Sequence, residues 1–156
     1  MNNSVKFAVA MSGGVDSSVA ALLATKDSKN AVGVTMSVFD GASKQDSIDA
    51  AAVAERLGFE HVTFDLSAEF ADTVMRYFAD SYIAGETPNP CVFCNKAIKF
   101  GILFDKVKSL GCDIIATGHY ARTSKDASGR TLLEKAVFVE KDQSYVLWQL
   151  SQEQLA

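Results

Sequence analysis

A glycine-hinged turn between an apolar run and a helical pattern constrains this chain more than any other feature. The apolar residues 5–11 lead into Ser12-Gly13-Gly14-Val15-Asp16-Ser17-Ser18, after which apolar side chains recur at helical spacing. A strand, turn and helix in this order leave backbone N–H groups at the positive end of a helix dipole, where phosphate oxygens bind. The two glycines let the backbone approach an anion closely. The segment therefore predicts a phosphate-binding loop.

The side chains of this loop indicate which ligands it could bind and which reaction it could support. Ser12, Ser17 and Ser18 add hydroxyl donors, and the Asp16 carboxylate could hold a hydrated magnesium ion beside bound phosphates. The loop lacks the Gly-Lys-Ser/Thr ending of the Walker loop, so transfer of a terminal phosphoryl group is not predicted. The alternative is a serine- and glycine-rich turn that binds nothing. The Asp16-Ser17 pair at this offset from Ser-Gly-Gly, with a strand before the loop, argues against that alternative.

Composition limits the class of protein. The 156 residues are 48% apolar, which is enough for a core, and we expect a single domain over residues 1–156. No apolar stretch approaches the ~20 residues that cross a bilayer, and no signal-peptide pattern is present, so we expect a cytoplasmic protein. The net charge of −4 argues against a basic nucleic-acid clamp.

Short β-rich runs alternate with longer helical patterns, which predicts an α/β fold with a doubly wound parallel sheet. The patterns place strands near residues 5–11, 31–38, 61–65 and 112–117, and helices near 17–27, 45–57, 68–83 and 95–110.

The patterns after residue 120 are weaker. Residues 123–131 read as a surface loop, residues 132–139 as a strand, and Asp142 as the cap of a helix that begins near Gln143. That helical pattern still runs at residue 156, so we expect the chain to be part of something longer.

A second segment, residues 89–96, carries two cysteines in the order Asn89-Pro90-Cys91-Val92-Phe93-Cys94-Asn95-Lys96. We expect Cys94 to stand just before a helix, where backbone amides, Lys96 and Lys99 favour the thiolate. Such a thiolate is a good nucleophile and a good acceptor of sulfur. Cys91 could pair with Cys94, share a metal with it or stabilise it as a persulfide.

A structural zinc site is the alternative use of these cysteines. It needs four ligands, and only His61, His119 and Cys112 remain to complete it. Cys112 begins a predicted strand, where a small buried thiol that packs in the core is the more common role.

Four motifs together resemble the tRNA-specific 2-thiouridylases, a family of PP-loop ATP pyrophosphatases that thiolate the wobble uridine of certain tRNAs. They are the Ser12–Ser18 loop, residues 87–100 from Thr87-Pro88-Asn89-Pro90 to Ile98-Lys99-Phe100, residues 116–122, and residues 141–145. The resemblance implies the adenine-nucleotide alpha-hydrolase-like form of the α/β fold.

The resemblance assigns roles to residues of this chain. ATP would be held by Ala10, Met11, Ser12, Gly13, Gly14, Val15, Asp16, Ser17, Ser18, Met36 and Gly118, with Met36 at the adenine. The target base would contact Asn89, Pro90 and Cys91, and tRNA would also contact Lys141, Asp142 and Gln143. Three alternatives stay open. Met36 could be a core residue, His119 a buried histidine rather than a nucleotide contact, and residues 141–143 a helix start.

The implied reaction has two stages, with Cys94 and Cys91 as catalytic residues. ATP with magnesium adenylates the C2 oxygen of the flipped-out uridine, and Cys94, loaded as a persulfide by a sulfur-carrier protein, then delivers sulfur. The family's second catalytic cysteine and its tRNA-binding regions lie downstream of residues 141–143. We therefore expect this chain to bind nucleotide without completing thiolation alone.

Cys91 departs from the family, since some members carry aspartate there. A Cys-x-x-Cys pair could hold an iron–sulfur cluster if a third ligand came from another part of the protein. Three other classes compete: another PP-loop ATP pyrophosphatase, such as a tRNA-lysidine synthetase or an amidotransferase synthetase domain, a non-catalytic module that senses ATP, and a zinc-stabilised structural domain. The first does not explain two cysteines after Pro-Asn-Pro.

Overall fold

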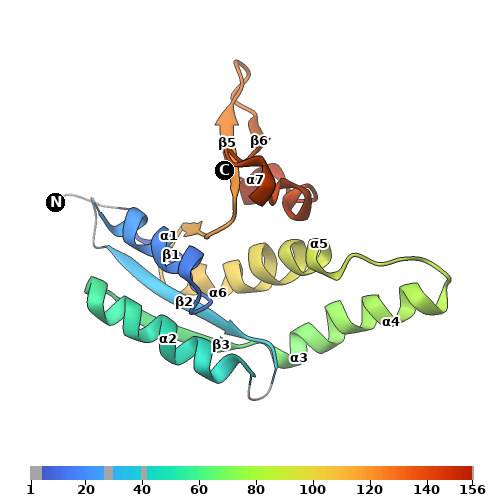
Figure 1. Ribbon diagram of the computed structural model, residues 1–156, viewed down its shortest axis with the longest axis horizontal. Coiled ribbons are helices and arrows are strands. Elements are labelled where there is room, and N and C mark those ends of the chain that lie inside the picture. Colours follow the sequence, from blue (N-terminus) through green and yellow to red (C-terminus); the bar gives the residue numbers. More distant parts are fainter. Residues whose placement is uncertain (1–4, 27–29, 40–41, 156) are drawn as a thin grey trace. The chain divides into compact units, whose positions relative to one another are not determined.

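The structure is a computed structural model that describes residues 5–26, 30–39 and 42–155 (Figure 1). Contacts divide the chain into two compact units. Unit 1 comprises Met1–Ala68 and Leu103–Gly118, and unit 2 comprises Glu69–Ile102 and His119–Ala156. Each unit is described by itself below.

Unit 1 is built on a parallel sheet of four strands in the order β3-β2-β1-β4. Its strands are β1 (Phe7–Ala10), β2 (Ala31–Ser37), β3 (Glu60–Asp65) and β4 (Ile114–Ala116). The predicted parallel α/β sheet is confirmed, and each strand lies within two residues of its predicted bounds or inside them. Cys112 precedes β4 and is fully buried, as expected of a core thiol.

Helices cover this sheet because both of its faces are apolar. Helices α1 (Val15–Thr25) and α2 (Ala42–Leu57) pack on one face, where Ala21, Ala50 and Ala54 form a buried cluster with Val9 and Met11. Side chains alternate along a strand, so Ala8, Val32 and Val34 point to the opposite face, and they are also buried. Burial on both faces is typical of a parallel sheet.

The connection between β3 and β4 reverses the winding of the sheet. The chain moves outward from β1 through β2 to β3, and after α6 (Leu103–Ser109) it returns to the other side of β1 as β4. Ligands of open α/β sheets bind outside the carboxyl ends of the strands at such a reversal. In this chain the carboxyl ends of β1 and β4 carry residues 11–14 and 117–118.

Unit 2 contains helical segments and a β-hairpin (Figure 1). The segment α3 (Ser67–Phe70) enters it. Its elements are then η1 (Ala71–Met75), α4 (Arg76–Ile83), α5 (Pro90–Cys94), η2 (Asn95–Ile102), β5 (Ala121–Lys125), β6 (Thr131–Lys135), η3 (Val139–Lys141), η4 (Ser144–Leu147) and α7 (Gln152–Leu155). The segments η1 and η2 are π-helical, and η3 and η4 are 3₁₀.

Three predictions about the end of the chain are wrong in type or extent. Residues 123–131 are not a simple loop, because β5 and β6 pair and only residues 126–130 form the turn, where Asp126 Oδ1 accepts from the Ser128 and Arg130 N–H groups. The predicted strand 132–139 ends at Lys135. The predicted helix from Gln143 is interrupted, because η4 ends at Leu147 and α7 starts separately behind Ser151.

No helix within the described ranges combines the length and the apolar character that crossing a membrane requires.

In the turn after β1, only glycine fits at position 13. Its φ is +72°, and a Cβ built there would lie 2.6 Å from the Asp46 carbonyl oxygen. Gly111 in the same unit has a similar φ of +77° with no atom within 4 Å of such a Cβ. We predict that Gly111→Ala lowers the free energy of unfolding by about 1 kcal/mol through backbone strain. Gly13→Ala should lower it by about 3 kcal/mol, because a backbone clash is added. Urea unfolding measures both, and equal losses would contradict the clash.

Candidate functional site

The loop after β1 is closed by the Ser17 side chain. Ser17 is 7% exposed, and its Oγ accepts from the Ser12 N–H at 3.2 Å and donates to the Gly14 carbonyl at 3.0 Å. The Ser18 hydroxyl donates to the same carbonyl at 2.9 Å. These two hydroxyls, predicted as donors to phosphate, are therefore engaged within the loop and fix its shape.

The first turn of α1 presents its amides at this loop. Gly14 is the N-cap in an extended conformation, with φ −82° and ψ 167°, and no side chain in the described part of the chain caps it. Val15 and Asp16 are exposed. The N–H groups that begin a helix lack intrahelical partners, so this turn can donate to an anion, and the helix dipole favours negative charge there.

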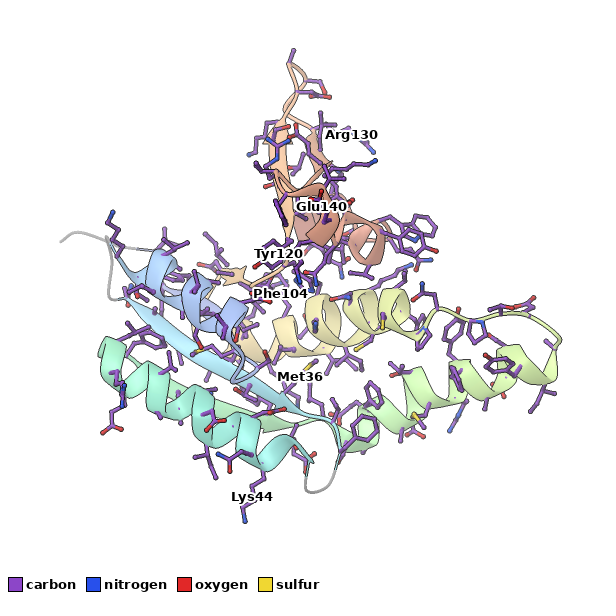
Figure 2. The ribbon with its side chains drawn as sticks, in the orientation of Figure 1. Met36, Lys44, Phe104, Tyr120, Arg130 and Glu140 are labelled. Carbon is purple, nitrogen blue, oxygen red and sulfur yellow. The ribbon has the colours of Figure 1, made fainter. Side chains whose placement is uncertain are left out.

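Gly118 presses the loop after β4 against the same turn. A Cβ built on Gly118 would lie 2.9 Å from the Asp16 carbonyl oxygen and 2.9 Å from the Ser17 nitrogen, so no larger residue fits. Ala10 ends β1, and Met36 is a half-buried residue near the end of β2, opposite Phe64 in the sheet (Figure 2). The fold thus gathers the predicted nucleotide residues at one edge of the sheet.

The two cysteines of unit 2 lie on a helix that begins earlier than predicted. Asn89 caps it by accepting from the Val92 N–H at 3.2 Å, and Pro90 takes the first position, where its missing N–H is not needed. Helical residues then run from Pro90 to Ser109 rather than over 95–110. Cys91 is exposed in the first turn, and Cys94 is half-buried one turn later.

The prediction that helix amides favour a Cys94 thiolate is wrong. Burial raises the pKa of the Cys94 thiol, the charge of Lys99 lowers that pKa, and Cys91 raises it further. The helix N-terminus cannot compensate, because the dipole effect is confined to the first turn. Lys96, which is exposed, is not among the groups that shift the Cys94 pKa, so Lys99 alone acts in the predicted direction.

Lys99 and His119 complete the surroundings of these thiols. Burial lowers the pKa of Lys99, and the negative charges of ionised Cys94 and Cys91 oppose that shift. Burial, with the Lys99 charge second, lowers the pKa of His119 to about 4, so His119 is neutral at pH 7. The His119 ring centroid lies 6.1 Å from that of Phe100. A coupled set of two thiols, an ammonium and a neutral imidazole therefore occupies this part of unit 2.

Sequence reasoning missed two polar residues of this region. Asn95 is 4% exposed, its Nδ2 donates to the Cys91 carbonyl at 2.9 Å, and its Oδ1 is buried without a partner in the described part of the chain. No sequence signal marks it. Gln154 donates through Nε2 to the carbonyls of Phe100 and Lys96 at 2.7 and 3.3 Å. The sequence signal that could have identified Gln154 is the Ser-x-x-Gln spacing from Ser151, which is typical of a capping box.

The residues predicted to contact tRNA have structural tasks in this fold. The Asp142 carboxylate accepts from the Ala136 N–H at 2.8 Å and from the Ser144 hydroxyl at 2.7 Å, and these bonds lower its pKa. Gln143 Oε1 accepts from the Tyr120 N–H at 2.9 Å. Lys141 is exposed at the end of η3. The alternative for residues 141–143 is a helix start, and the 3₁₀ segment η4 does begin at Ser144 directly after them.

Within residues 5–26, 30–39 and 42–155, no group of three or more His, Cys, Asp or Glu side chains is placed to hold a metal ion. Cys91 and Cys94 consequently have no third ligand for zinc or for an iron–sulfur cluster among these residues. A single carboxylate such as Asp16 suits magnesium, which keeps several waters and binds phosphate oxygens as well.

Comparison with known proteins places the chain. Residues 5–156 match the family described as "tRNA methyl transferase HUP domain". The chain belongs to this family. Among its relatives, the tRNA-specific 2-thiouridylase MnmA of Pelobacter propionicus is 48% identical over 156 residues, covering 97% of this chain and 44% of its own length. The tRNA-specific 2-thiouridylase MnmA 2 of a Thermoanaerobacter species is 48% identical over 168 residues, covering 99% and 46%. The resemblance to the 2-thiouridylases is thereby confirmed.

Two further facts qualify the match to the family. The chain spans a little under half the length of these curated relatives. Among solved structures, an NH3-dependent NAD synthetase from Campylobacter jejuni matches with a TM-score of 0.50 and 18% identity, covering 72% of this chain and 47% of that one. At this identity the likeness concerns the fold alone, and it agrees with the predicted adenine-nucleotide alpha-hydrolase-like architecture.

We predict that the stability of the fold depends on pH through His119. Its pKa in the folded chain is about 4, below the ordinary 6.5, so folding favours the neutral ring. The stability that depends on this group is present above pH 6.5 and is lost as the pH falls from 6.5 toward 4, because the unfolded chain then binds more protons. NMR titration of the two histidines checks this, with His119→Gln to assign the signals. A His119 midpoint at or above 6.5 would contradict the burial.

Proposed function

We propose that this chain is the nucleotide-binding and sulfur-accepting portion of an ATP-dependent tRNA 2-thiouridylase. One observation carries the proposal: the same chain that is 48% identical to such enzymes has both an anion-binding helix start and a helix with two thiols. The family description speaks of methyl transfer, whereas the relatives' names speak of thiolation. The two thiols beside Lys99 favour sulfur.

The loop residues fit the phosphates of ATP. Gly118 keeps a Cβ out of the tight junction between the two loops, and Gly13 keeps one away from the Asp46 carbonyl of α2. The first-turn amides of α1 supply donors. Asp16 would bind magnesium, and Met36 would contact the adenine. When bound, ATP supplies an α-phosphorus that converts a uridine C2 oxygen into a leaving group. The remaining residues from Ala10 to Ser18 hold the loop in shape.

Cys94 is the proposed sulfur carrier. A persulfide formed on it by a donor protein would attack C2 of the activated uridine through its outer sulfur, and AMP would leave with the oxygen. A second thiol must then attack the Cys94 sulfur, which breaks the S–S bond and leaves a disulfide on the protein. Asn89, Pro90 and Cys91 would border the target base, and Lys141 would contact the tRNA backbone.

A non-catalytic nucleotide-binding module is the competing function. It shares the ATP site and predicts binding without release of pyrophosphate, even when tRNA and the parts found in longer relatives are supplied. The zinc-stabilised structural domain is not favoured, because the described residues offer no third ligand beside Cys91 and Cys94.

We predict that the chain binds ATP with magnesium in calorimetry but forms no thiouridine from tRNA and a persulfide donor. Fused to the carboxy-terminal portion of the Pelobacter propionicus relative, it should form thiouridine. Cys94→Ser in the fusion should lower thiouridine formation by at least about 100-fold with an unchanged Kd for ATP, because only the sulfur carrier is lost. The readout is mass spectrometry of tRNA nucleosides.

Cys112→Ser is the matched control, since that thiol is buried in unit 1 and should leave thiolation unchanged. Thiouridine formation by Cys94→Ser at the wild-type rate would rule out the assigned carrier. ATP binding by the fusion without any pyrophosphate release in the presence of tRNA would favour the non-catalytic module instead.

A further inference from the structure

The cysteine helix changes its hydrogen-bonding pattern directly after Cys94. The segment η2 (Asn95–Ile102) is π-helical, so its backbone bonds connect residues five apart instead of four. In an α-helix the residue five positions on lies ~140° around the axis, on a different side. In a π-helix it returns to roughly the same side. Lys99 is five residues after Cys94, so the π-helical segment turns Lys99 toward the side of the thiol.

The electrostatics agree with this placement. Lys99 is the group that lowers the pKa of Cys94, and Cys94 is the first of the two thiols that raise the pKa of Lys99. Both groups are partly buried, so water screens their interaction less than at the surface. Lys96, three residues closer in sequence, is exposed and exerts no such effect.

Other charged or titratable groups on the neighbouring elements do not take over this role. On η1, Asp72 is exposed and forms an ion pair with Arg76. On η4 and α7, Tyr145 and Glu153 are exposed. His119 is neutral at pH 7 because burial and Lys99 lower its pKa. Among the described residues, the groups whose charge shifts the pKa of Cys94 are Lys99 and Cys91 alone.

The π-helical segment needs support, because such segments are rare and leave backbone carbonyls poorly satisfied where they join an α-helix. Gly101 gives it room, since a Cβ there would lie 3.1 Å from the Lys96 carbonyl oxygen. Gln154 gives it donors, because its Nε2 bonds the carbonyls of Phe100 and Lys96 at 2.7 and 3.3 Å.

Gln154 is itself held in place by a reciprocal capping box at the start of α7. Its Oε1 accepts from the Ser151 N–H at 3.0 Å, and its own N–H donates to the Ser151 hydroxyl at 3.2 Å. Both ends of its amide group are therefore bonded, which fixes the direction in which Nε2 donates. A residue 60 positions after Cys94 thus bonds the backbone of the segment that follows that cysteine.

We propose that Lys99 and Gln154 are positioning residues for the sulfur chemistry of Cys94. Gln154 holds η2 in its π-helical form, this form keeps the Lys99 ammonium beside the sulfur, and the ammonium stabilises the anion that remains when the Cys94 proton passes to water. The role in sulfur transfer rests on the proposed function. The ionisation of the thiol does not, and it can be measured without ATP or tRNA.

The test is the pH dependence of Cys94 alkylation by iodoacetamide in the whole chain carrying Cys91→Ser and Cys112→Ser. Lys99→Met should raise the midpoint by about one pH unit, because an opposite charge near a thiol is lost. Lys99→Arg should restore it, and the matched control Lys96→Met should change it by less than about 0.3. A midpoint that Lys99→Met leaves unchanged, or that Lys96→Met raises as much, would overturn the proposal.

Gln154 is tested by two substitutions that remove the Nε2 donor. Gln154→Glu keeps an acceptor oxygen for the Ser151 N–H of the capping box, and Gln154→Met removes the donor without adding charge. Both should raise the midpoint, and in the Lys99→Met background Gln154→Met should raise it no further, because Gln154 acts through Lys99. A midpoint raised by Gln154→Glu but not by Gln154→Met would indicate simple charge repulsion and would overturn the role of η2. Additive effects of Lys99→Met and Gln154→Met on the midpoint would also overturn it. Circular dichroism confirms that each variant is folded.

The outcomes separate this inference from the proposed function. If the midpoint depends on Lys99 and Gln154 while the fusion forms no thiouridine, the sulfurtransferase assignment fails and the positioning of the thiol stands. If the fusion forms thiouridine and substitution of Lys99 and Gln154 leaves the alkylation midpoint unchanged, the positioning role fails and the sulfurtransferase assignment stands.

Discussion

The parallel pairing of β1 with β4 is the constraint on which the proposed nucleotide site depends. It places Phe7 opposite Ile114 and Val9 opposite Ala116, so both strands end at the same edge of the sheet. The two loops that follow then meet so closely that a Cβ on Gly118 would contact the backbone of Asp16 and Ser17. No side chain therefore fits between the two loops at this point, and the start of α1 has no side-chain cap among the described residues.

The chemistry of the cysteines follows from a competition between burial and charge. Burial is the larger effect on Cys94, so its thiol pKa is raised overall, and the Lys99 ammonium offsets only part of that rise. A thiol of this kind is protonated more often at neutral pH than a cysteine at a helix N-terminus would be. Cys91, which is exposed in the first turn of the helix, has the more typical position of a reactive cysteine.

Local patterns predicted the sheet and its helices well, because buried strands and amphipathic helices leave strong signals. The apolar runs before Ser12 and around Val34 and the helical pattern over residues 45–57 each correspond to an observed element. The position of the proposed nucleotide residues at one edge of the sheet was also predictable, because strand ends and glycines are visible in the sequence. The start of the cysteine helix was missed because the two prolines were read as a break in the pattern. In the structure Pro90 is the first residue of the helix, and Asn89 caps it by accepting from the Val92 N–H.

What sequence reasoning could not find depends on contacts between distant segments. The π-helical form of η2 has no local pattern, and its support comes from Gln154, 54 residues after Phe100 in the chain. The burial of Cys94 and the orphaned Oδ1 of Asn95 likewise arise from packing that the motif does not encode. Asp142 and Gln143 were recognised by their motif, while their bonds to Ala136 and Tyr120 became visible only in the fold.

We propose that the loops after β1 and β4 together bind the phosphates of ATP. Backbone amide NMR of the chain, titrated with an ATP analogue whose α,β-bridging oxygen is replaced by methylene, measures this binding at each residue. The amide signals of Val15, Asp16, Ser17 and Gly118 should shift together with one saturation curve, and those of the β5–β6 turn at residues 126–130 should not shift. Saturable shifts that leave the first turn of α1 and Gly118 unperturbed would contradict it.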